Sequence, residues 1–211
     1  MKTNTIITIG REFGSAGREI GYKVAKEFGI KLYDKEMLAR AAKESGICEE
    51  IFESHDEKPT SSFLYSLVMD TYSMGYSGNT YTDMPINHKV FLAQFDAIKK
   101  IADEGPCILV GRCADYALSE YKDCFSVFVH ADTDWRINRL SQKHNKTAKE
   151  AKDMINKTDK SRSSYYNYYT NKKWGAASSY NLCVDSSKLG IDGAAKAIIQ
   201  AIEIFDSIKN K

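Results

Sequence analysis

The chain has 211 residues, 43% of them hydrophobic, and its 13 glycines outnumber its 3 prolines. This length and composition are enough to bury one sizeable core, so we expect a single domain without internal repeats or a low-complexity tail. Because 30 basic residues nearly balance 28 acidic ones, the formal charge of +2 argues against a general polyanion-binding protein. We therefore expect no nucleic-acid partner.

Cysteine usage and apolar run lengths bear on location. The five cysteines are odd in number, widely spaced and without zinc-ligand spacing, so we expect reduced thiols and no metal-binding cluster. The first residues enter a strand pattern without a charged leader, and no apolar run approaches the roughly 18 residues of a membrane span. These features predict a soluble, cytoplasmic protein with no membrane partner.

In chain order, apolar runs alternate with helical patterns, which is typical of parallel strands joined by crossover helices. Helices are predicted from about residue 17, over 90–102 and 134–140, and around 194–205, where apolar residues recur at spacings of three and four. The fold class is therefore α/β with three layers around a central parallel sheet of about five strands. The strands are expected at residues 5–9, 31–33, 107–110, 125–130 and 181–184.

Two segments are not needed to form a central sheet with its covering helices. Residues 49–88 mix short helical patterns with a polar, tyrosine-rich loop, and residues 143–178 form a long polar helix pattern. In an open parallel sheet, ligands bind outside the carboxyl ends of the strands, where such segments converge. We interpret both segments as insertions that lie over the ligand-binding edge of the sheet, within one domain of residues 1–211.

The stretch GREFGSAGREIG at residues 10–21 follows the first strand and opens a helix near Gly17. Its glycines let main-chain N–H groups approach an anion at the positive helix end. Against the phosphate-loop pattern G-x-x-x-x-G-K-[ST], Glu12 stands for the first glycine, Arg18 for the lysine and Glu19 for the hydroxyl residue. The alternative is a glycine-rich turn that binds no ligand.

Segments along almost the whole chain resemble the cytidylate-kinase-like family of P-loop kinases. The resemblance is strongest at REFGSAGRE, GRCADY and KWG, and weakest between residues 50 and 90. It implies a P-loop kinase fold in which residues 49–88 are the insertion that binds the nucleoside monophosphate and residues 143–178 are the lid. It also implies transfer of the γ-phosphoryl group of ATP to CMP or dCMP, with Mg²⁺.

The resemblance assigns roles to particular residues. The loop residues that would bind ATP are Gly14, Ser15, Ala16, Gly17, Arg18 and Glu19. Arg112, in the GRC segment, and Arg162, on the lid-like segment, match arginines that contact acceptor and donor phosphates. With Arg18 they form the expected catalytic set, because phosphoryl transfer needs positioned cations.

Further residues are candidates on the acceptor side. They are Asp34 after the second strand, Asp115 as a substitute carboxylate, Arg136 after the fourth strand and Asp185 after the last. Asp34 and Asp185 fit equally the reading of helix or turn caps. We expect no protein-held metal; Mg²⁺ would be bound by ATP oxygens, waters and either Ser15 or Asp34.

Two features of the lid-like segment carry predictions of their own. Tyr165, Tyr166 and Tyr169 follow Arg162 at helical spacings, which predicts one face that combines guanidinium and aromatic surface. Trp174 and Gly175 are interpreted as a hinge or an anchor.

Three functions remain open at this point. The first is an ATP-dependent kinase for CMP or dCMP, and the second is a P-loop kinase with another small acceptor, because residues 49–88 match poorly. The third is a nucleotide-binding regulator with little catalysis, indicated by Arg18 and Glu19 in the loop. In each case the partner is a small-molecule nucleotide or acceptor, and the sequence indicates no oligomeric state.

Overall fold

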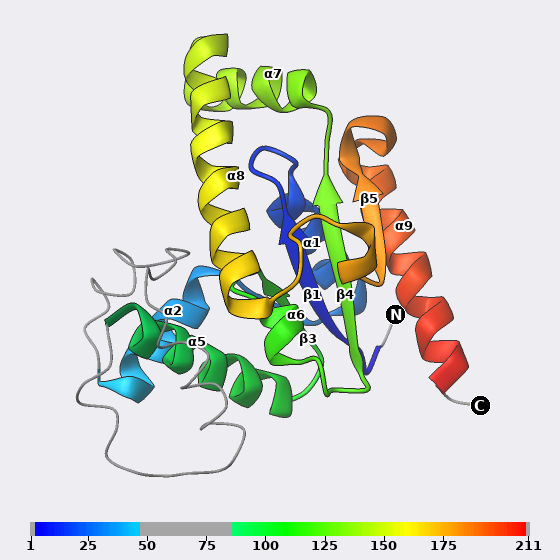
Figure 1. Cartoon of the computed structure of the whole chain (residues 1–211). Helices are drawn as coiled ribbons and strands as arrows, with labels where there is room; N and C mark the ends of the chain where they lie inside the picture. The colour runs from blue at the N-terminus through cyan, green and yellow to red at the C-terminus, as the bar shows by residue number, and fades with distance from the viewer. Residues whose placement is uncertain (1–2, 47–85, 210–211) are drawn as a thin grey trace.

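The computed structural model describes residues 3–46 and 86–209; Cys48, His55 and most of the 49–88 segment lie outside this part. The described strands form one parallel sheet in the order β2-β3-β1-β4-β5 (Figure 1). They are β1 (Ile6–Arg11), β2 (Lys31–Tyr33), β3 (Cys107–Val110), β4 (Cys124–His130) and β5 (Leu182–Asp185). The predicted five-stranded parallel sheet is therefore confirmed.

Helices connect these strands and cover both faces of the sheet. They are α1 (Gly17–Phe28), α2 (Lys35–Ser45), α5 (Ile86–Asp103), α6 (Ala114–Ala117), α7 (Thr133–His144), α8 (Ala148–Thr170) and α9 (Ser186–Lys209), with a 3-10 turn at Ala177–Ser179. Asp132 caps α7 by accepting the N–H groups of Asp134 and Trp135. Thr147 and Glu150 form a capping box at the start of α8. The capping box fixes the start of α8 within the long polar pattern predicted at residues 143–178, and α7 covers the separate helix predicted at 134–140.

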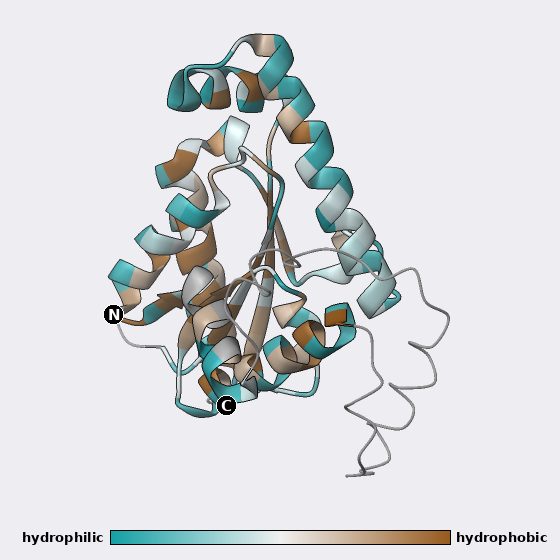
Figure 2. Ribbon diagram, turned by 90° about the vertical axis from the view of Figure 1, so that its left-hand side faces the viewer, coloured by the Kyte–Doolittle hydropathy of each residue, from teal (hydrophilic) through white to brown (hydrophobic). Residues whose placement is uncertain are grey.

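Each face of the sheet has its own hydrophobic core. On one face, Ile9 of β1 packs with Ile20 of α1 and Ile198 of α9; on the other, Leu109 of β3 packs with Ile98 of α5. Figure 2 shows the hydrophobic colouring concentrated on the strands and on the inner sides of the helices, while α7 and α8 are mostly hydrophilic. Coverage on both faces explains why the strands read as continuous apolar runs.

Tyr165, Tyr166 and Tyr169 of α8 are buried, and Tyr165 and Tyr166 also line a small cavity together with Arg162, so part of the predicted guanidinium and aromatic face borders a cavity. Tyr169 is 1% exposed and stacks on Phe91 of α5 with ring centroids 3.9 Å apart. The Tyr165 hydroxyl donates to Gln94 at 3.1 Å. Tyr165 and Tyr169 pack against α5, while Tyr166 contacts Asp115 of α6 and Tyr180, so these tyrosines fix the C-terminal half of α8.

The segment after α8 is also anchored. The ring of Trp174 meets Phe128 of β4 edge-on with centroids 5.2 Å apart, and the main-chain N–H of Trp174 donates to the Asn167 side-chain oxygen at 2.7 Å. Gly175 follows with a φ of 73°, and a Cβ there would lie 3.3 Å from the Phe128 ring. These contacts agree with the anchor interpretation.

Four of the cysteines lie in the described part, and all four are free thiols: Cys107, Cys113, Cys124 and Cys183. Burial raises the pKa of Cys107 and that of Cys124 to about 12, so both thiols stay protonated at neutral pH. Among the described helices, none combines the length and the apolar character that crossing a bilayer requires.

Candidate active site

The turn between β1 and α1 is held by its own polar groups. The Ser15 hydroxyl lies 2.9 Å from the Glu12 carbonyl and 3.0 Å from the Val129 carbonyl, and it is fully buried. The Glu12 carboxylate accepts the N–H of Ala131 at 3.0 Å. Glu12, which stands where a phosphate loop usually has glycine, therefore ties the turn to the end of β4.

The backbone of this turn passes too close to its neighbours to carry side chains at its glycines. A Cβ on Gly17 would lie 2.7 Å from the Cβ of Arg11, and one on Gly14 would lie 3.0 Å from Leu140. Gly14 and Ala16 both have positive φ, 86° and 63°. The sequence pattern GSAG is thus required by packing and by backbone conformation.

The N-terminus of α1 is suited to an anion. The first turn of any helix leaves N–H groups without partners inside the helix, and Ala16, at the N-cap, makes no side-chain capping bond. A cavity of about 370 Å³ lies at this end of α1. Its basic lining residues are Arg11, Arg18, Arg139, Lys143, His144 and Arg162. We call it the loop cavity.

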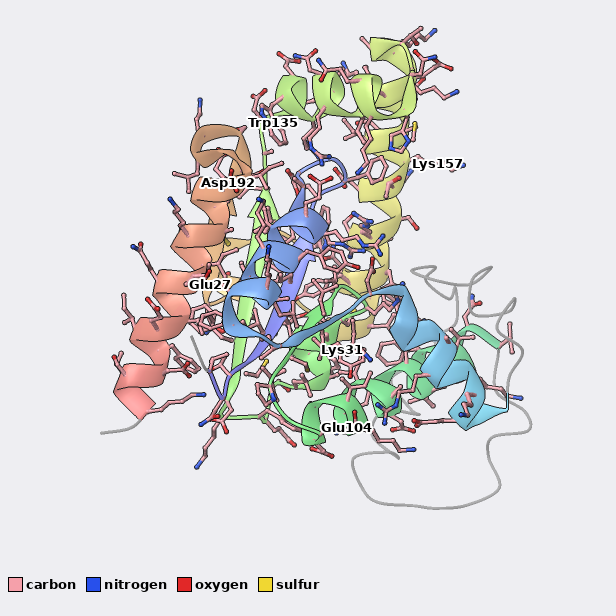
Figure 3. All side chains as sticks on the ribbon, turned by 180° about the vertical axis from the view of Figure 1, so that it is seen from behind. Glu27, Lys31, Glu104, Trp135, Lys157 and Asp192 are labelled. Carbon is pink, nitrogen blue, oxygen red and sulfur yellow. The ribbon has the colours of Figure 1, made fainter. Side chains whose placement is uncertain are left out.

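Helices α7 and α8 stand over the loop cavity. Figure 1 shows the β1–α1 turn reaching up beside α8 at the carboxyl edge of the sheet, and Figure 3, which labels Trp135 on α7 and Lys157 on α8, shows the same arrangement from behind. Side chains from the segments expected to form a phosphate loop and a lid therefore meet at one edge.

Glu19, at the position of the usual hydroxyl residue, is paired with two cations of α7. Its carboxylate accepts from Arg139 and, at 3.0 Å, from Lys143. The hydrogen bond from Arg139 is the main reason that the pKa of Glu19 lies below its ordinary value. Glu19 is therefore ionised at neutral pH and positions two basic side chains at the rim of the loop cavity.

Asp34 joins the arginine of the loop to the arginine of the GRC segment. Its carboxylate lies 3.1 Å from Arg18 Nε and 3.1 Å from Arg112 Nη1. Arg112 is 5% exposed and also donates to the Val110 carbonyl. Asp34 directly precedes α2, so it occupies the predicted cap position while its side chain bridges the two cations.

The turn that carries Arg112 is strained. Gly111, Arg112 and Cys113 have φ values of 78°, 53° and 56°, so two consecutive non-glycine residues lie in the left-handed region. Such conformations cost on the order of 1–3 kcal/mol each and persist where surrounding contacts hold them, often at ligand sites. Here the bond from Arg112 to Asp34 is one such contact.

A second, much smaller cavity of about 20 Å³ lies against this turn, and we call it the inner cavity. Its charged lining residues are Arg11, Arg112, Asp115 and Arg162. Asp115 is half-buried there and accepts the Tyr166 hydroxyl at 2.7 Å. Burial, opposed by that hydrogen bond, raises the pKa of Asp115 above its ordinary value.

This shift predicts the pH dependence of an Asp115→Asn variant. Because the folded-state pKa is raised, the folded protein binds the proton more tightly than the unfolded chain, and wild-type stability falls as pH rises through that interval. Asparagine removes this dependence and still offers an oxygen to Tyr166. We therefore expect the free energy of unfolding of Asp115→Asn, measured with urea, to rise relative to that of the wild type between about pH 4 and about pH 7.

The matched control is Asp103→Asn, since Asp103 accepts the Tyr121 hydroxyl at 2.8 Å on the exposed surface. If both variants show the same pH trend relative to wild type, burial of Asp115 is not its cause.

Arg136 lies beneath the turn and lines neither the loop cavity nor the inner cavity. Its Nη1 is 2.6 Å from Asp159 of α8 and 3.6 Å from Glu12. Asp159 also accepts the N–H of Phe13 at 2.7 Å. Arg136 and Asp159 together therefore hold α8 on the turn, and the predicted contact between Arg136 and an acceptor is not among the described cavity contacts.

Asp185 is likewise absent from the linings of these two cavities. Its carboxylate accepts the Ser187 N–H at 2.9 Å and the Ser187 hydroxyl, whose bond is the main reason that the Asp185 pKa is lowered. This is the capping role that the sequence left open.

Removal of Asp159 should loosen the contact between α8 and the turn. We expect Asp159→Ala to lower the free energy of unfolding by about 2 kcal/mol, because it leaves the Phe13 N–H without its acceptor and removes the shortest ion pair of the buried Arg136, which keeps Glu12 at 3.6 Å. Asp159→Asn, which keeps an acceptor for Phe13, should cost roughly half as much. Urea denaturation measures both, and Asp153→Ala at an exposed position of α8 is the control. An equal loss in Asp153→Ala would contradict the assigned role.

Comparison with known sequences decides the family. The model of the cytidylate kinase-like family matches residues 6–188, which is most of the chain. The chain belongs to this family. A search of curated proteins returns no significant match. The predicted resemblance is therefore confirmed at the level of the family.

Solved structures agree on the fold of this cytidylate kinase-like protein. An uncharacterized protein from Eubacterium ventriosum is 28% identical with a TM-score of 0.68, covering 94% of this chain and 98% of that one. The shikimate kinase of Bacteroides thetaiotaomicron is 12% identical with a TM-score of 0.51, covering 94% and 98%. A gluconokinase from Sinorhizobium meliloti is 10% identical with a TM-score of 0.52, covering 100% and 98%. The fold is that of the P-loop kinases.

Arg139 is a candidate cation in the sequence, as part of the helix after the fourth strand, whereas Arg11, Lys143 and Asp159 are not among the predicted site residues. Arg11, Arg139 and Lys143 line the loop cavity, and Asp159 holds α8 to the turn. The spacing of Arg136, Arg139 and Lys143 along α7 placed cations on one side of a helix, but the helix had to be docked over the turn before their target was visible.

Proposed function

We propose that this protein is an ATP-dependent nucleoside monophosphate kinase that acts on CMP or dCMP. The supporting observation is the adjacency of two cavities at the carboxyl edge of the sheet, each lined by several arginines. The loop cavity has room and charge for a triphosphate, and the inner cavity offers cations to an acceptor phosphate. A neutral hydroxyl acceptor would not need three guanidinium groups.

The proposed step needs no protein base. An oxygen of the acceptor monophosphate attacks the γ-phosphorus of ATP, the bond from that phosphorus to the bridging oxygen breaks, and ADP leaves with the electron pair. The second pKa of a phosphate monoester is about 6, so the attacking oxygen is largely deprotonated at neutral pH. Main-chain N–H groups of α1 would hold the donor phosphates, while Arg18 and Arg162 would balance their charge.

The residues that could help to bind Mg²⁺ are Ser15 and Asp34. The described residues contain no group of three or more metal-ligating side chains. The Ser15 hydroxyl is buried against carbonyls and the Asp34 carboxylate is paired with two arginines, so neither matches its proposed role as a ligand. We propose that Mg²⁺ arrives bound to ATP and waters. We also propose a cytoplasmic location, because ATP is available there.

A coupled assay with ATP, Mg²⁺ and a panel of nucleoside monophosphates tests the proposal. Release of ADP that depends on CMP or dCMP supports it. Release that depends on an unrelated acceptor would replace it with a different P-loop kinase. ATP binding without turnover on any acceptor would favour the nucleotide-binding regulator, for which the pairing of Arg18 with Asp34 is the specific support.

A further inference from the structure

We propose that Arg11, the last residue of β1, is a catalytic residue that contacts the phosphoryl group while it passes from donor to acceptor. The inference rests on the proposed kinase function and adds to it a residue that the sequence pattern did not indicate. It follows from the position of Arg11 between the loop cavity and the inner cavity.

Among the described residues, only Arg11 and Arg162 line both cavities. Arg18 lines the loop cavity alone, and Arg112 lines the inner cavity alone. The inner cavity, at about 20 Å³, is too small to hold an acceptor, so an acceptor phosphate would lie in front of it beside Arg112. A group that moves from an ATP in the loop cavity to that phosphate must pass the boundary between the two cavities. The two arginines that border both cavities are therefore the ones placed to follow it.

The stem of the Arg11 side chain is fixed on the turn. Its Cβ and Cγ would lie 2.7 Å and 3.2 Å from a Cβ built on Gly17, so they pack directly on the glycine that opens α1. Arg11 is only partly buried, which leaves its guanidinium within reach of the cavities. The absence of a side chain at Gly17 thus makes room for this arginine.

Arg162 reaches the same place from α8. Its Nη1 donates to the Arg11 carbonyl at 3.4 Å, and its guanidinium lies 5.7 Å from the centre of the Phe13 ring. A strand end and a helix from distant parts of the chain therefore bring two arginine residues to one boundary. Either can present two N–H groups to phosphate oxygens, which an ammonium cannot do in the same fixed geometry.

The chemistry gives these groups a role in the transition state. As the bond between the γ-phosphorus and the bridging oxygen breaks and the bond to the acceptor oxygen forms, negative charge is spread over the three equatorial oxygens and no proton is transferred. A preorganised cation at that point stabilises the transferring group more than either ground state. Arg11 should therefore affect kcat more than the affinity for ATP.

The test uses the full chain with Arg11→Met, whose unbranched stem keeps the packing on Gly17 but removes the charge. We expect kcat with ATP and CMP to fall by about a hundredfold, with the Kd for ATP changed less than about threefold and urea unfolding unchanged. Lys157→Met removes one charge from an exposed position of α8, labelled in Figure 3, and should leave kcat unchanged. Lys143→Met, in the loop cavity alone, should instead raise the Kd for ATP.

A second measurement does not depend on turnover. ADP with aluminium fluoride and CMP imitates the transferring group, so it should raise the melting temperature of the wild type above the value with ADP and CMP. Arg11→Met should lose this extra increase, and Arg11→Lys should regain only part of it.

The outcomes separate the two proposals. A wild type that phosphorylates CMP, together with an Arg11→Met variant that keeps kcat within threefold or keeps the fluoride effect, overturns the role of Arg11 and leaves the kinase function standing. A wild type that neither binds ATP nor phosphorylates any acceptor overturns the kinase function, and the role of Arg11 with it.

Discussion

Replacement of Gly17 by Ala is expected to weaken ATP binding by roughly a thousandfold. The new Cβ would lie 2.7 Å from the Cβ of Arg11, an atom that cannot move without its backbone, so the turn or the end of β1 must shift. The shift misplaces the N–H groups at the start of α1. Loss of two charge-assisted hydrogen bonds from these N–H groups to the ATP phosphates, each worth about 1.5–3 kcal/mol, accounts for the thousandfold loss of affinity.

Isothermal titration with ATP measures this effect, and Gly29→Ala is its control on the same helix. Gly29 ends α1 with a φ of 66°, and a Cβ there meets nothing within 4 Å. That variant should lose about 1 kcal/mol of stability from backbone strain while keeping the wild-type affinity for ATP. If Gly17→Ala binds ATP as the wild type does, the turn is not the ATP site.

Replacement of Arg112 by Met is expected to lower the free energy of unfolding by about 3 kcal/mol. The change leaves Asp34 without one of its two cations in a setting where that carboxylate is only 11% exposed, and it frees a turn with two left-handed non-glycine residues. This value lies at the lower end of the roughly 3–5 kcal/mol that breaking a buried ion pair costs, because Arg18 remains beside Asp34.

A double-mutant cycle with Asp34→Asn isolates the pair. We expect a coupling energy of about 1–3 kcal/mol between positions 34 and 112 in urea denaturation. Arg40→Met removes an arginine whose partners, Glu44 and Glu104, lie at the surface, and it should cost clearly less. Additive effects at positions 34 and 112 would show that the ion pair contributes nothing to folding.

Local pattern was sufficient for much of the fold. The strands at residues 31–33 and 107–110 begin and end as predicted, and the fully buried apolar run of residues 107–110 has few other ways to be buried. The start of α1 at Gly17 was predicted from the glycine spacing. Element ends were less certain where tertiary contacts extend a helix, as in α5, which begins at Ile86.

The site was predicted less completely, and particular residues show why. Arg112 was found from its motif, but its pairing with Asp34 joins residues 78 positions apart. The tyrosines of α8 have the right spacing for one face, yet spacing does not say whether that face meets a ligand or α5. Asp159 was not predicted as a site residue, because nothing in the neighbouring sequence of a polar helix shows that its carboxylate accepts hydrogen bonds from the distant Phe13 and Arg136.

The sequence by itself determined the α/β class, the parallel order of strand and helix, the glycine-rich turn and the family, since these depend on neighbouring residues and short periodicities. Only the tertiary structure decided which cations share a cavity, that Arg136 holds α8 to the turn, and that Arg11 stands between two cavities. Those facts depend on how α7 and α8 dock over the sheet, and docking is set by the summed packing of residues far apart in the chain.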